Sequence, residues 1–134
     1  MTKALTRITY VDDEADIRTV TKLVLERLGG FTVDACTGGQ DALARMGEFA
    51  PDLVLLDVMM PQMDGPQTLQ AMRANPALAE TPVLFVTARS QAHEIAAYKA
   101  MGVVDVITKP FDPAALPQAL RSLWKDFHDR KEAR

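Results

Sequence analysis

Short apolar runs alternate with segments of helical periodicity along the whole chain, and this alternation restricts the possible folds more than any other feature. After each run, apolar residues recur at the three- and four-residue spacing of an amphipathic helix. Strands that alternate with helices through short connections predict one α/β domain with a parallel sheet and right-handed crossovers. The runs with the length of strands are 8–11, 31–35, 53–57, 83–86 and 103–108.

The expected helices differ in how clearly their ends are marked. Two glycines, Gly29 and Gly30, should end the first helix. Thr37 with Gln40 could form a capping box at the start of the second. The last helix should begin in regular form at about Pro117, because a proline in its interior would remove a hydrogen-bond donor. The first helix should present an apolar face made of Ile17, Val20, Val24 and Leu28.

Length and composition indicate one ordinary domain. The chain has 134 residues, of which 48% are hydrophobic, so we expect a single domain over 1–134 with its core in about 6–127. Residues 128–134 should form a charged, solvated tail. The net charge of −3 argues against a broad nucleic-acid-binding face, which needs an excess of lysine and arginine. No apolar stretch has the length of a signal peptide or a membrane span, and a single cysteine, Cys36, fits a cytoplasmic location.

Polar side chains gather where the expected strands end. Because ligands of open parallel sheets bind beyond the carboxyl ends of the strands, these groups should meet on one rim. Adjacent carboxylates repel one another and would take up protons unless a cation joined them. Mg²⁺ suits such a site, since it prefers few carboxylates, several waters and room for a phosphate oxygen. The residues concerned are Asp12, Asp13, Asp57, Thr87 and Lys109.

This group of residues suggests phosphoryl transfer. An aspartate beside Mg²⁺ can act as a nucleophile toward phosphorus and form an acyl phosphate. Mg²⁺, Lys109 and the Thr87 hydroxyl could each hold one phosphoryl oxygen, which is the main requirement of this chemistry. Each residue alone has an ordinary interpretation, such as a helix cap for Asp12 or Asp13. Their joint placement on one rim favours the functional interpretation.

Four segments around these residues resemble the receiver domains of two-component signalling, including the chemotaxis response regulator. They are Val-Asp-Asp-Glu at 11–14, Leu-Asp-Val-Met-Met-Pro-Gln-Met-Asp-Gly at 56–65, Val-Thr-Ala at 86–88 and Ile-Thr-Lys-Pro-Phe at 107–111. The resemblance covers about residues 6–127. It implies a flavodoxin-like (βα)5 three-layer sandwich whose five-stranded parallel sheet has the order 2-1-3-4-5.

The resemblance also implies a metal site. Asp57 would be the phosphoacceptor. Asp13 and Asp57 would ligate Mg²⁺, joined by the backbone carbonyl of Met59, and Asp12 would act partly through water. Mn²⁺ could substitute for Mg²⁺.

Further roles follow from the same resemblance. Thr87 and Lys109 would bind the phosphoryl oxygens, and a cis Lys109–Pro110 bond would orient the lysine. The donor would be a phosphohistidine on a histidine kinase or a phosphotransfer protein, and small acyl phosphates could replace it. Such a domain is a regulatory phosphoacceptor that assists its own phosphorylation and dephosphorylation, and we do not count it as an enzyme.

Some positions are expected to set how this receiver switches. Receivers commonly carry Tyr or Phe three residues before the lysine, where this chain has Val106. Helix 91–101 and its loop could then carry the switch alone, or Tyr98 could take over part of it. Met59 and Arg89 occupy positions that tune water access to the phosphate in the family.

We interpret the chain as a phosphorylation-dependent signalling module without an attached output domain. Its output would be a contact with an unknown downstream protein through helix 91–101, strand 103–108 and the last helix. An alternative is a phosphorelay intermediate or a phosphate sink. We expect a monomer that could dimerise on phosphorylation, with neither direct nucleic-acid binding nor membrane insertion.

Other functions fit the sequence less well. A haloacid-dehalogenase-type phosphatase also uses a strand-end aspartate with Mg²⁺, but it usually has a second aspartate two residues later, where this chain has Met59. A flavin-binding domain would need a phosphate-binding loop after the first strand, where the acids at 12–14 would repel a phosphate. A degenerate receiver that serves as a scaffold conflicts with the presence of all the site residues.

Side chains away from the rim carry weaker expectations. Trp124, near the apolar stripe of the last helix, could either anchor a partner or complete the core. His93 and His128 lie among polar residues and should be solvated. Cys36 follows the second strand and should be a small, half-buried residue rather than a reactive thiol.

Overall fold

The computed structural model describes residues 3–132 and contains one sheet of five parallel strands. The strand order is β2-β1-β3-β4-β5, and every neighbouring pair is parallel. This is the flavodoxin-like order that the resemblance to receiver domains implies, and the structure confirms it. The strands are β1 (Arg7–Val11), β2 (Thr32–Cys36), β3 (Leu53–Asp57), β4 (Val83–Thr87) and β5 (Asp105–Thr108).

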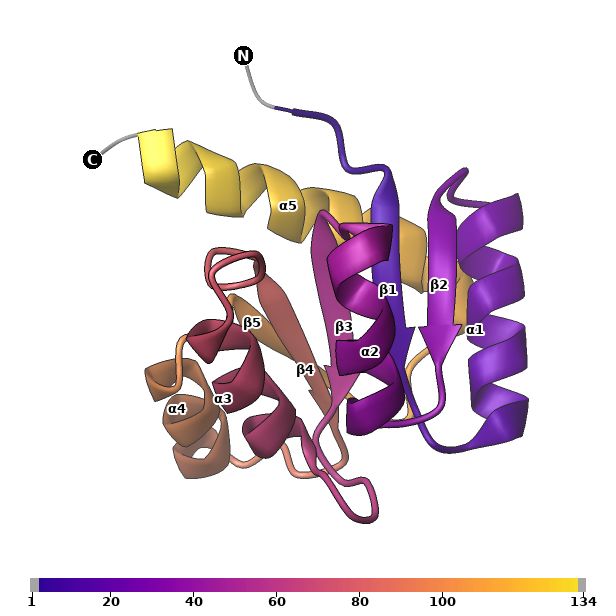
Figure 1. The fold of residues 1–134 in the computed structure, drawn as a ribbon. Coiled ribbons are helices and arrows are strands. Elements are labelled where there is room, and N and C mark those ends of the chain that lie inside the picture. Colours follow the sequence, from indigo (N-terminus) through magenta and orange to yellow (C-terminus); the bar gives the residue numbers. More distant parts are fainter. Residues whose placement is uncertain (1–2, 133–134) are drawn as a thin grey trace.

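Helices cover both faces of this sheet and make three layers (Figure 1). One face carries α1 (Ala15–Arg27) and α5 (Leu116–Glu132). The other face carries α2 (Gly39–Phe49), α3 (Gly65–Ala74) and α4 (Ala92–Ala100). A single 3-10 turn, Pro113–Ala115, precedes α5, so the regular helix begins within one residue of the expected position.

The central strands are buried on both sides because helices cover them. Every residue of β3 and β4 is buried, which explains why both read as continuous apolar runs. One hydrophobic cluster joins the sheet to α2 and α3 through Met46 and Met72, and the other joins it to α1 and α5 through Leu25 and Leu120. Helix α4 differs, since none of its residues is buried.

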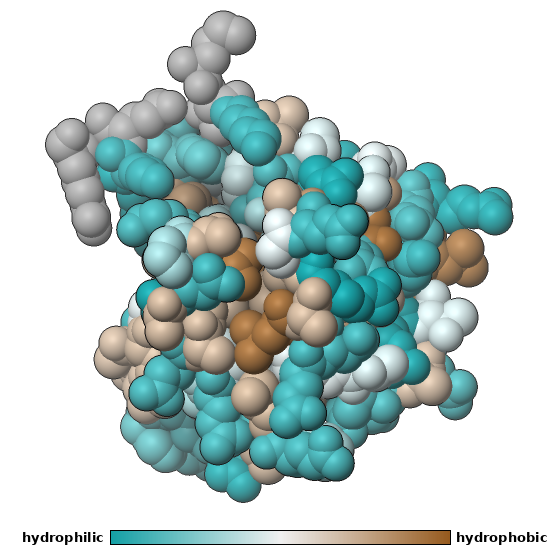
Figure 2. Space-filling model, in the orientation of Figure 1, coloured by the Kyte–Doolittle hydropathy of each residue, from teal (hydrophilic) through white to brown (hydrophobic). Residues whose placement is uncertain are grey.

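The face that carries α2, α3 and α4 is mostly hydrophilic, and hydrophobic side chains gather in a hollow near its middle (Figure 2). Among the described residues, the exposed large apolar side chains are Val20, Leu23, Leu28, Met59 and Met101. Scattered exposed apolar residues are common on protein surfaces and need no functional explanation. Within residues 3–132, no helix is long and apolar enough to cross a membrane.

The first helix turns a different side to the core from the one expected. Its buried residues are Thr21 and Leu25, whereas Val20 and Leu28 are 49% and 65% exposed. Part of the apolar face, Ile17 with Val20, lines a surface pocket instead of the core. The repeat of apolar residues therefore located the helix correctly but not its buried side.

The second helix begins without the capping box expected between Thr37 and Gln40. Its N-cap is Gly38, and both the N–H and the hydroxyl of Thr37 donate to the Asp41 carboxylate. A carboxylate accepts a hydrogen bond more strongly than an amide does, which explains why Thr37 donates to Asp41 and not to the side chain of Gln40.

The end of the chain is more closely packed than expected. Helix α5 continues to Glu132, and His128 is half-buried, with its ring centroid 4.2 Å from that of Trp124. Trp124 is 9% exposed and donates its indole N–H to the Lys3 carbonyl at 2.7 Å, so it completes the core. Cys36 is fully buried. The last two residues of the expected tail, 133 and 134, lie outside the described residues.

Candidate functional site

The carboxyl ends of the strands bring the predicted acids to one rim of the sheet. Strands β1 and β3 are neighbours, so Asp12, which follows β1, lies beside Asp57, the last residue of β3. Single carboxylate oxygens of Asp12, Asp13 and Asp57 lie within 4.8 Å of one another. We call these three residues the acid cluster.

Lys109 lies inside the acid cluster and bridges two of its members. Its Nζ is 2.9 Å from Oδ2 of Asp57 and 3.3 Å from Oδ2 of Asp12. The Glu14 carboxylate is a more distant partner, at 3.8 Å. The Lys109–Pro110 peptide bond is cis, as the resemblance implied. Lys109 therefore brings one positive charge to a group of carboxylates.

The surroundings of Asp57 favour the neutral form of its carboxyl group more than water favours that form in an exposed aspartate. Burial raises the pKa of Asp57, and the negative charge of Asp12 raises it further. The hydrogen bond and the positive charge of Lys109 lower this pKa but do not outweigh burial, so it remains raised. Burial lowers the pKa of Lys109, but the hydrogen bond and charge of Asp57, with those of Asp12, outweigh it, and that pKa is raised. A further positive charge would stabilise the ionised Asp57.

The chemistry of the acid cluster fits a hard divalent cation. Mg²⁺ takes oxygen ligands and is usually held by one or two carboxylates together with waters. Asp12 and Asp57 are buried while Asp13 is exposed, so the cluster reaches solvent at Asp13. Met59 donates its N–H to Oδ1 of Asp57 at 3.3 Å, and its side chain is 58% exposed. The Met59 carbonyl as a metal ligand stays a prediction.

A close backbone contact holds the loop after β3 against Asp57. The Gly65 N–H donates to the Val58 carbonyl at 2.9 Å. A Cβ atom at Gly65 would lie 2.7 Å from the Asp57 carbonyl oxygen, so only glycine allows this approach. Asp64 and Gln67 then start α3 with a complete capping box. The loop that follows Asp57 is thus fixed at its far end.

Thr87 lies on the rim at the end of β4, the strand next to β3. Asp57 pairs with Val86 in the sheet, so Thr87 is one residue beyond the partner of Asp57. Thr87 is 1% exposed, and its hydroxyl accepts the Arg89 N–H at 3.0 Å. The Arg89 residue itself is exposed.

The two residues expected to influence switching lie behind Thr87. Tyr98 on α4 packs edge-on against Phe85 on β4, with ring centroids 5.5 Å apart. Val106 pairs with Phe85 in the sheet, and both Val106 and Tyr98 are partly buried against the same hydrophobic cluster. Tyr98 is therefore an aromatic contact between α4 and the strand that ends at Thr87.

Sequence reasoning missed Tyr10, which contacts the acid cluster from the interior. Tyr10 is fully buried on β1, and its hydroxyl donates to Oδ2 of Asp12 at 2.7 Å. Burial raises its pKa, and the hydrogen bond to Asp12 and the charge of Asp12 raise it further, so the phenol keeps its proton. The signal was available, because residues two apart in a strand point to the same face.

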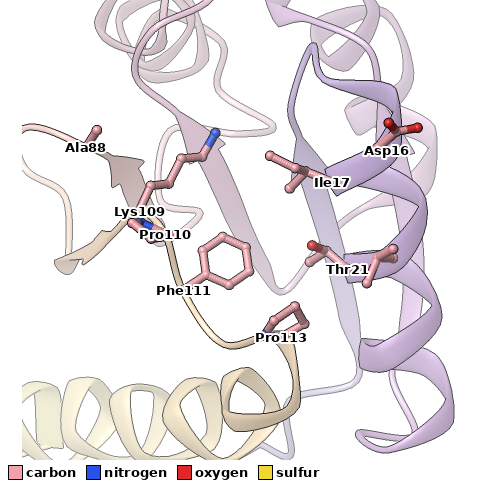
Figure 3. A pocket seen from close by; sticks show the side chains of 9 residues that line it. Asp16, Ile17, Thr21, Ala88, Lys109, Pro110, Phe111 and Pro113 are labelled. Carbon is pink, nitrogen blue, oxygen red and sulfur yellow. The ribbon is translucent and has the colours of Figure 1, made fainter.

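A pocket of about 470 Å³, which was not predicted either, lies beside Lys109 between α1 and residues 109–113. Ile17 and Phe111 line it from opposite sides, and the Lys109 amine points away from Phe111 and Pro113 (Figure 3). This pocket gives the rim an apolar flank on the α1 side.

Comparison with known sequences agrees with this geometry. The family model described as the response regulator receiver domain matches residues 8–121. The response regulator Rre1 of Synechocystis is 36% identical over 113 residues, which is 84% of this chain and 49% of that protein. The protein PilG of Pseudomonas aeruginosa is 29% identical, over 90% of this chain and 89% of its own length. The chain spans about half the length of Rre1 and of several other curated relatives.

Comparison with solved structures gives the same result. The chemotaxis response regulator CheY4 of Vibrio cholerae is 28% identical with a TM-score of 0.81, over 90% of this chain and 99% of the other. The N-terminal domain of a response regulator receiver protein from Methanoculleus marisnigri is 36% identical with a TM-score of 0.73, over 89% and 96% of the two chains. Because the family model matches most of its length and the fold agrees, the chain belongs to the response regulator receiver domains of two-component systems.

Proposed function

We propose that this receiver domain accepts a phosphoryl group on Asp57 in a reaction that depends on Mg²⁺. The observation that carries the proposal is the position of Asp57, buried at the end of β3, 2.9 Å from Lys109 and within the acid cluster. Burying several carboxylates around one lysine is costly unless a further cation joins them. The chain would act as a regulatory phosphoacceptor and not as an enzyme that turns over an external substrate.

The donor would be a phosphohistidine on a histidine kinase or a phosphotransfer protein. An Asp57 carboxylate oxygen attacks phosphorus and forms the new O–P bond, while the P–N bond breaks and the imidazole nitrogen keeps the electron pair. No general base is needed, because the attacking carboxylate carries no proton. A small acyl phosphate would react in the same way and release its carboxylate.

Lys109 and Thr87 would hold oxygens of the transferred group. Lys109 can exchange its bond to Oδ2 of Asp57 for a bond to a phosphoryl oxygen. The Thr87 hydroxyl accepts from Arg89 and so still has its own proton to donate. Mg²⁺, when bound by Asp12, Asp13 and Asp57, would supply positive charge that offsets the negative charge of the phosphoryl group.

The pocket beside Lys109 would receive part of the donor protein. Val20 lines this pocket and is 49% exposed, whereas Leu23, on the same helix and 50% exposed, does not line it. Val20→Glu should slow phosphoryl transfer from a donor protein about tenfold, because a charge would be buried in the contact. Leu23→Glu, as the matched control, should transfer at the parent's rate. Equal rates for both variants would argue against this surface.

Phosphorylation would shift the domain toward a form with a different surface on α4, β5 and α5. The support is that α4 has no buried residue and contacts β4 through Tyr98 and Phe85, next to Thr87. In Thr87→Ala, Asp57 should still be labelled, but the phosphorylation-dependent change in amide hydrogen exchange of α4 should shrink. An unchanged exchange response would contradict the proposed role of Thr87.

The central test is labelling by acetyl phosphate, followed by intact-mass analysis. The parent with Mg²⁺ should gain one phosphoryl group, chelation of Mg²⁺ should slow this gain greatly, and Asp57→Asn should abolish it. Asp52→Asn, which changes a buried carboxylate at the other end of β3, is the control and should be labelled. A phosphoryl adduct on Asp57→Asn would show that another residue is the acceptor.

A further inference from the structure

Tyr10 presents a hydroxyl to the acid cluster while its ring belongs to the core. The ring lies in the hydrophobic cluster between the sheet and the α1/α5 layer, and none of the residue is exposed. Phenylalanine would fill the same space with apolar atoms alone. Packing therefore explains the ring but not the hydroxyl, which donates to Oδ2 of Asp12 at 2.7 Å.

The two oxygens of Asp12 have different partners. Oδ2 accepts from the Tyr10 hydroxyl and from Lys109 Nζ, the latter at 3.3 Å. Oδ1 accepts the Glu14 N–H at 2.9 Å. A carboxylate oxygen has about two acceptor positions. Oδ2 is thus saturated, and Oδ1 is the oxygen of Asp12 that keeps an acceptor position for another partner.

We propose that Tyr10 is a positioning residue of the metal site. Its hydroxyl fixes the orientation of the buried Asp12 carboxylate and leaves Oδ1 available to a divalent cation or to a water bound to that cation. This inference rests on the proposed Mg²⁺ dependence of the domain. Hydrogen-bond partners of metal-binding carboxylates commonly change metal affinity by about 10- to 100-fold when they are removed.

A purely structural role for the hydroxyl makes a different prediction. A buried phenol needs an acceptor, and Asp12 could serve only to satisfy it. In that case, Tyr10→Phe would change the stability of the domain and leave its affinity for Mg²⁺ unchanged. The affinity for the metal, measured without phosphorylation, separates the two roles.

Calorimetric titration of the full chain with MgCl₂ gives this affinity directly. Tyr10→Phe should raise the Kd for Mg²⁺ about tenfold. Thr9→Val is the matched control, because Thr9 is the neighbouring residue of β1, is fully buried, and has a hydroxyl without a hydrogen-bond partner among the described residues. Thr9→Val should keep the Kd of the parent. An equal Kd in Tyr10→Phe and in the parent would overturn the proposal.

Thermal unfolding separates weaker metal binding from a general loss of stability. The rise in Tm that Mg²⁺ causes, relative to the same protein with a chelator, depends on the Kd of the folded state. Each variant is compared with itself, so a folding defect cancels. At a Mg²⁺ concentration near the Kd of the parent, Tyr10→Phe should show a smaller rise than Thr9→Val. Equal rises would overturn the proposal.

Failure of the proposed function would look different from failure of this inference. If the parent binds no Mg²⁺, the metal-dependent function is wrong, and the role of Tyr10 falls with it. If the parent binds Mg²⁺ and is labelled on Asp57, but Tyr10→Phe has the same affinity, only the role of Tyr10 is wrong. Where the role is correct, saturating Mg²⁺ should restore the labelling rate of Tyr10→Phe to nearly that of the parent.

Discussion

Strand β3 lies between two buried carboxylates whose surroundings are opposite. Asp52, just before the strand, is 8% exposed, and Asp57, its last residue, is 3% exposed. Asp52 accepts the N–H groups of Thr6 and Arg7 and pairs with Lys3 at 2.7 Å. Asp57 has one lysine and two neighbouring acids. The Asp52 carboxylate is therefore saturated with hydrogen-bond donors, whereas the Asp57 carboxylate has too few donors to balance its burial beside two other acids.

The pKa values follow this difference. Burial raises the pKa of Asp52, but the hydrogen bonds from Lys3, Arg7 and Thr6 outweigh burial, and the pKa is lowered. At Asp57 burial prevails over Lys109, and the pKa is raised. The comparison shows how one strand can carry an acid whose pKa is lowered by its hydrogen-bond donors and an acid whose pKa stays raised. Such an uncompensated group is typical of a functional site.

Removing the saturated acid should have the largest effect on stability. Asp52→Ala leaves two backbone N–H groups without their acceptor, so the free energy of unfolding should fall by about 3 kcal/mol. The folded fraction should still be labelled on Asp57 by acetyl phosphate. Urea denaturation followed by circular dichroism measures the change. A loss below about 1 kcal/mol would remove Asp52 from the comparison.

Removing Lys109, the cation that contacts Asp57, should have the next largest effect. Lys109→Gln leaves Asp12 and Asp57 buried without their ammonium partner, so stability with a chelator present should fall by about 2 kcal/mol. Mg²⁺ should recover part of this loss, because it supplies positive charge to the same carboxylates. Denaturation with and without Mg²⁺ tests this, and an identical loss in both conditions would contradict the electrostatic explanation.

Neutralising Asp57 should have a smaller effect of the opposite sign. Asp57→Asn should raise the free energy of unfolding by about 1 kcal/mol at neutral pH with a chelator present, because it removes a buried charge next to other acids. The raised pKa means that the parent loses this cost as the pH falls through the folded pKa toward the ordinary value of 3.8. The advantage of Asp57→Asn should therefore shrink in acid.

Asp52→Asn should change the stability with the opposite sign to Asp57→Asn, and its pH dependence sharpens the comparison. Because the pKa of Asp52 is lowered, its contribution to stability is complete above the ordinary value of 3.8 and is lost as the pH falls through the folded pKa. The stability deficit of Asp52→Asn should thus persist to lower pH than the advantage of Asp57→Asn does. Denaturation of both variants and the parent over a pH series gives the two curves.

The smallest effect should come from the exposed partner of Asp52. The Lys3 side chain is 71% exposed, so water and salt screen its ion pair with Asp52. Lys3→Gln should lower the free energy of unfolding by about 0.5 kcal/mol, and high salt should reduce the difference. A loss as large as that of Asp52→Ala would mean that Lys3, and not the backbone N–H groups, holds Asp52.

The residues of the rim could be predicted because they depend only on where strands end. Asp12, Asp57 and Lys109 meet for that reason, and the alternation of apolar runs was enough to locate them. The saturation of Asp52 could not be predicted, since it depends on contacts between residues 45 positions apart in the sequence. The two-residue spacing places Tyr10 and Asp12 on the same face, but the hydroxyl contact between them also depends on their side-chain rotamers, which periodicity does not give.

Switching is the least predictable part of the molecule. The absence of an aromatic residue at Val106 was visible in the sequence, but the contact of Tyr98 with Phe85 depends on how α4 lies on the sheet. Helix α4 has no buried residue, so its apolar pattern could not fix its position. The role of Tyr98 in switching stays a prediction.

Trp124 is the only tryptophan of the chain, and it lies at the amino ends of the strands, near Leu53 and bonded to the Lys3 carbonyl. Its fluorescence should change when the domain unfolds, because the indole then leaves a nearly water-free environment. The acids lie at the carboxyl ends of the same strands, so the emission should hardly respond to a cation there. Tryptophan emission should therefore report unfolding of the domain without responding to a cation added at the opposite end of the sheet.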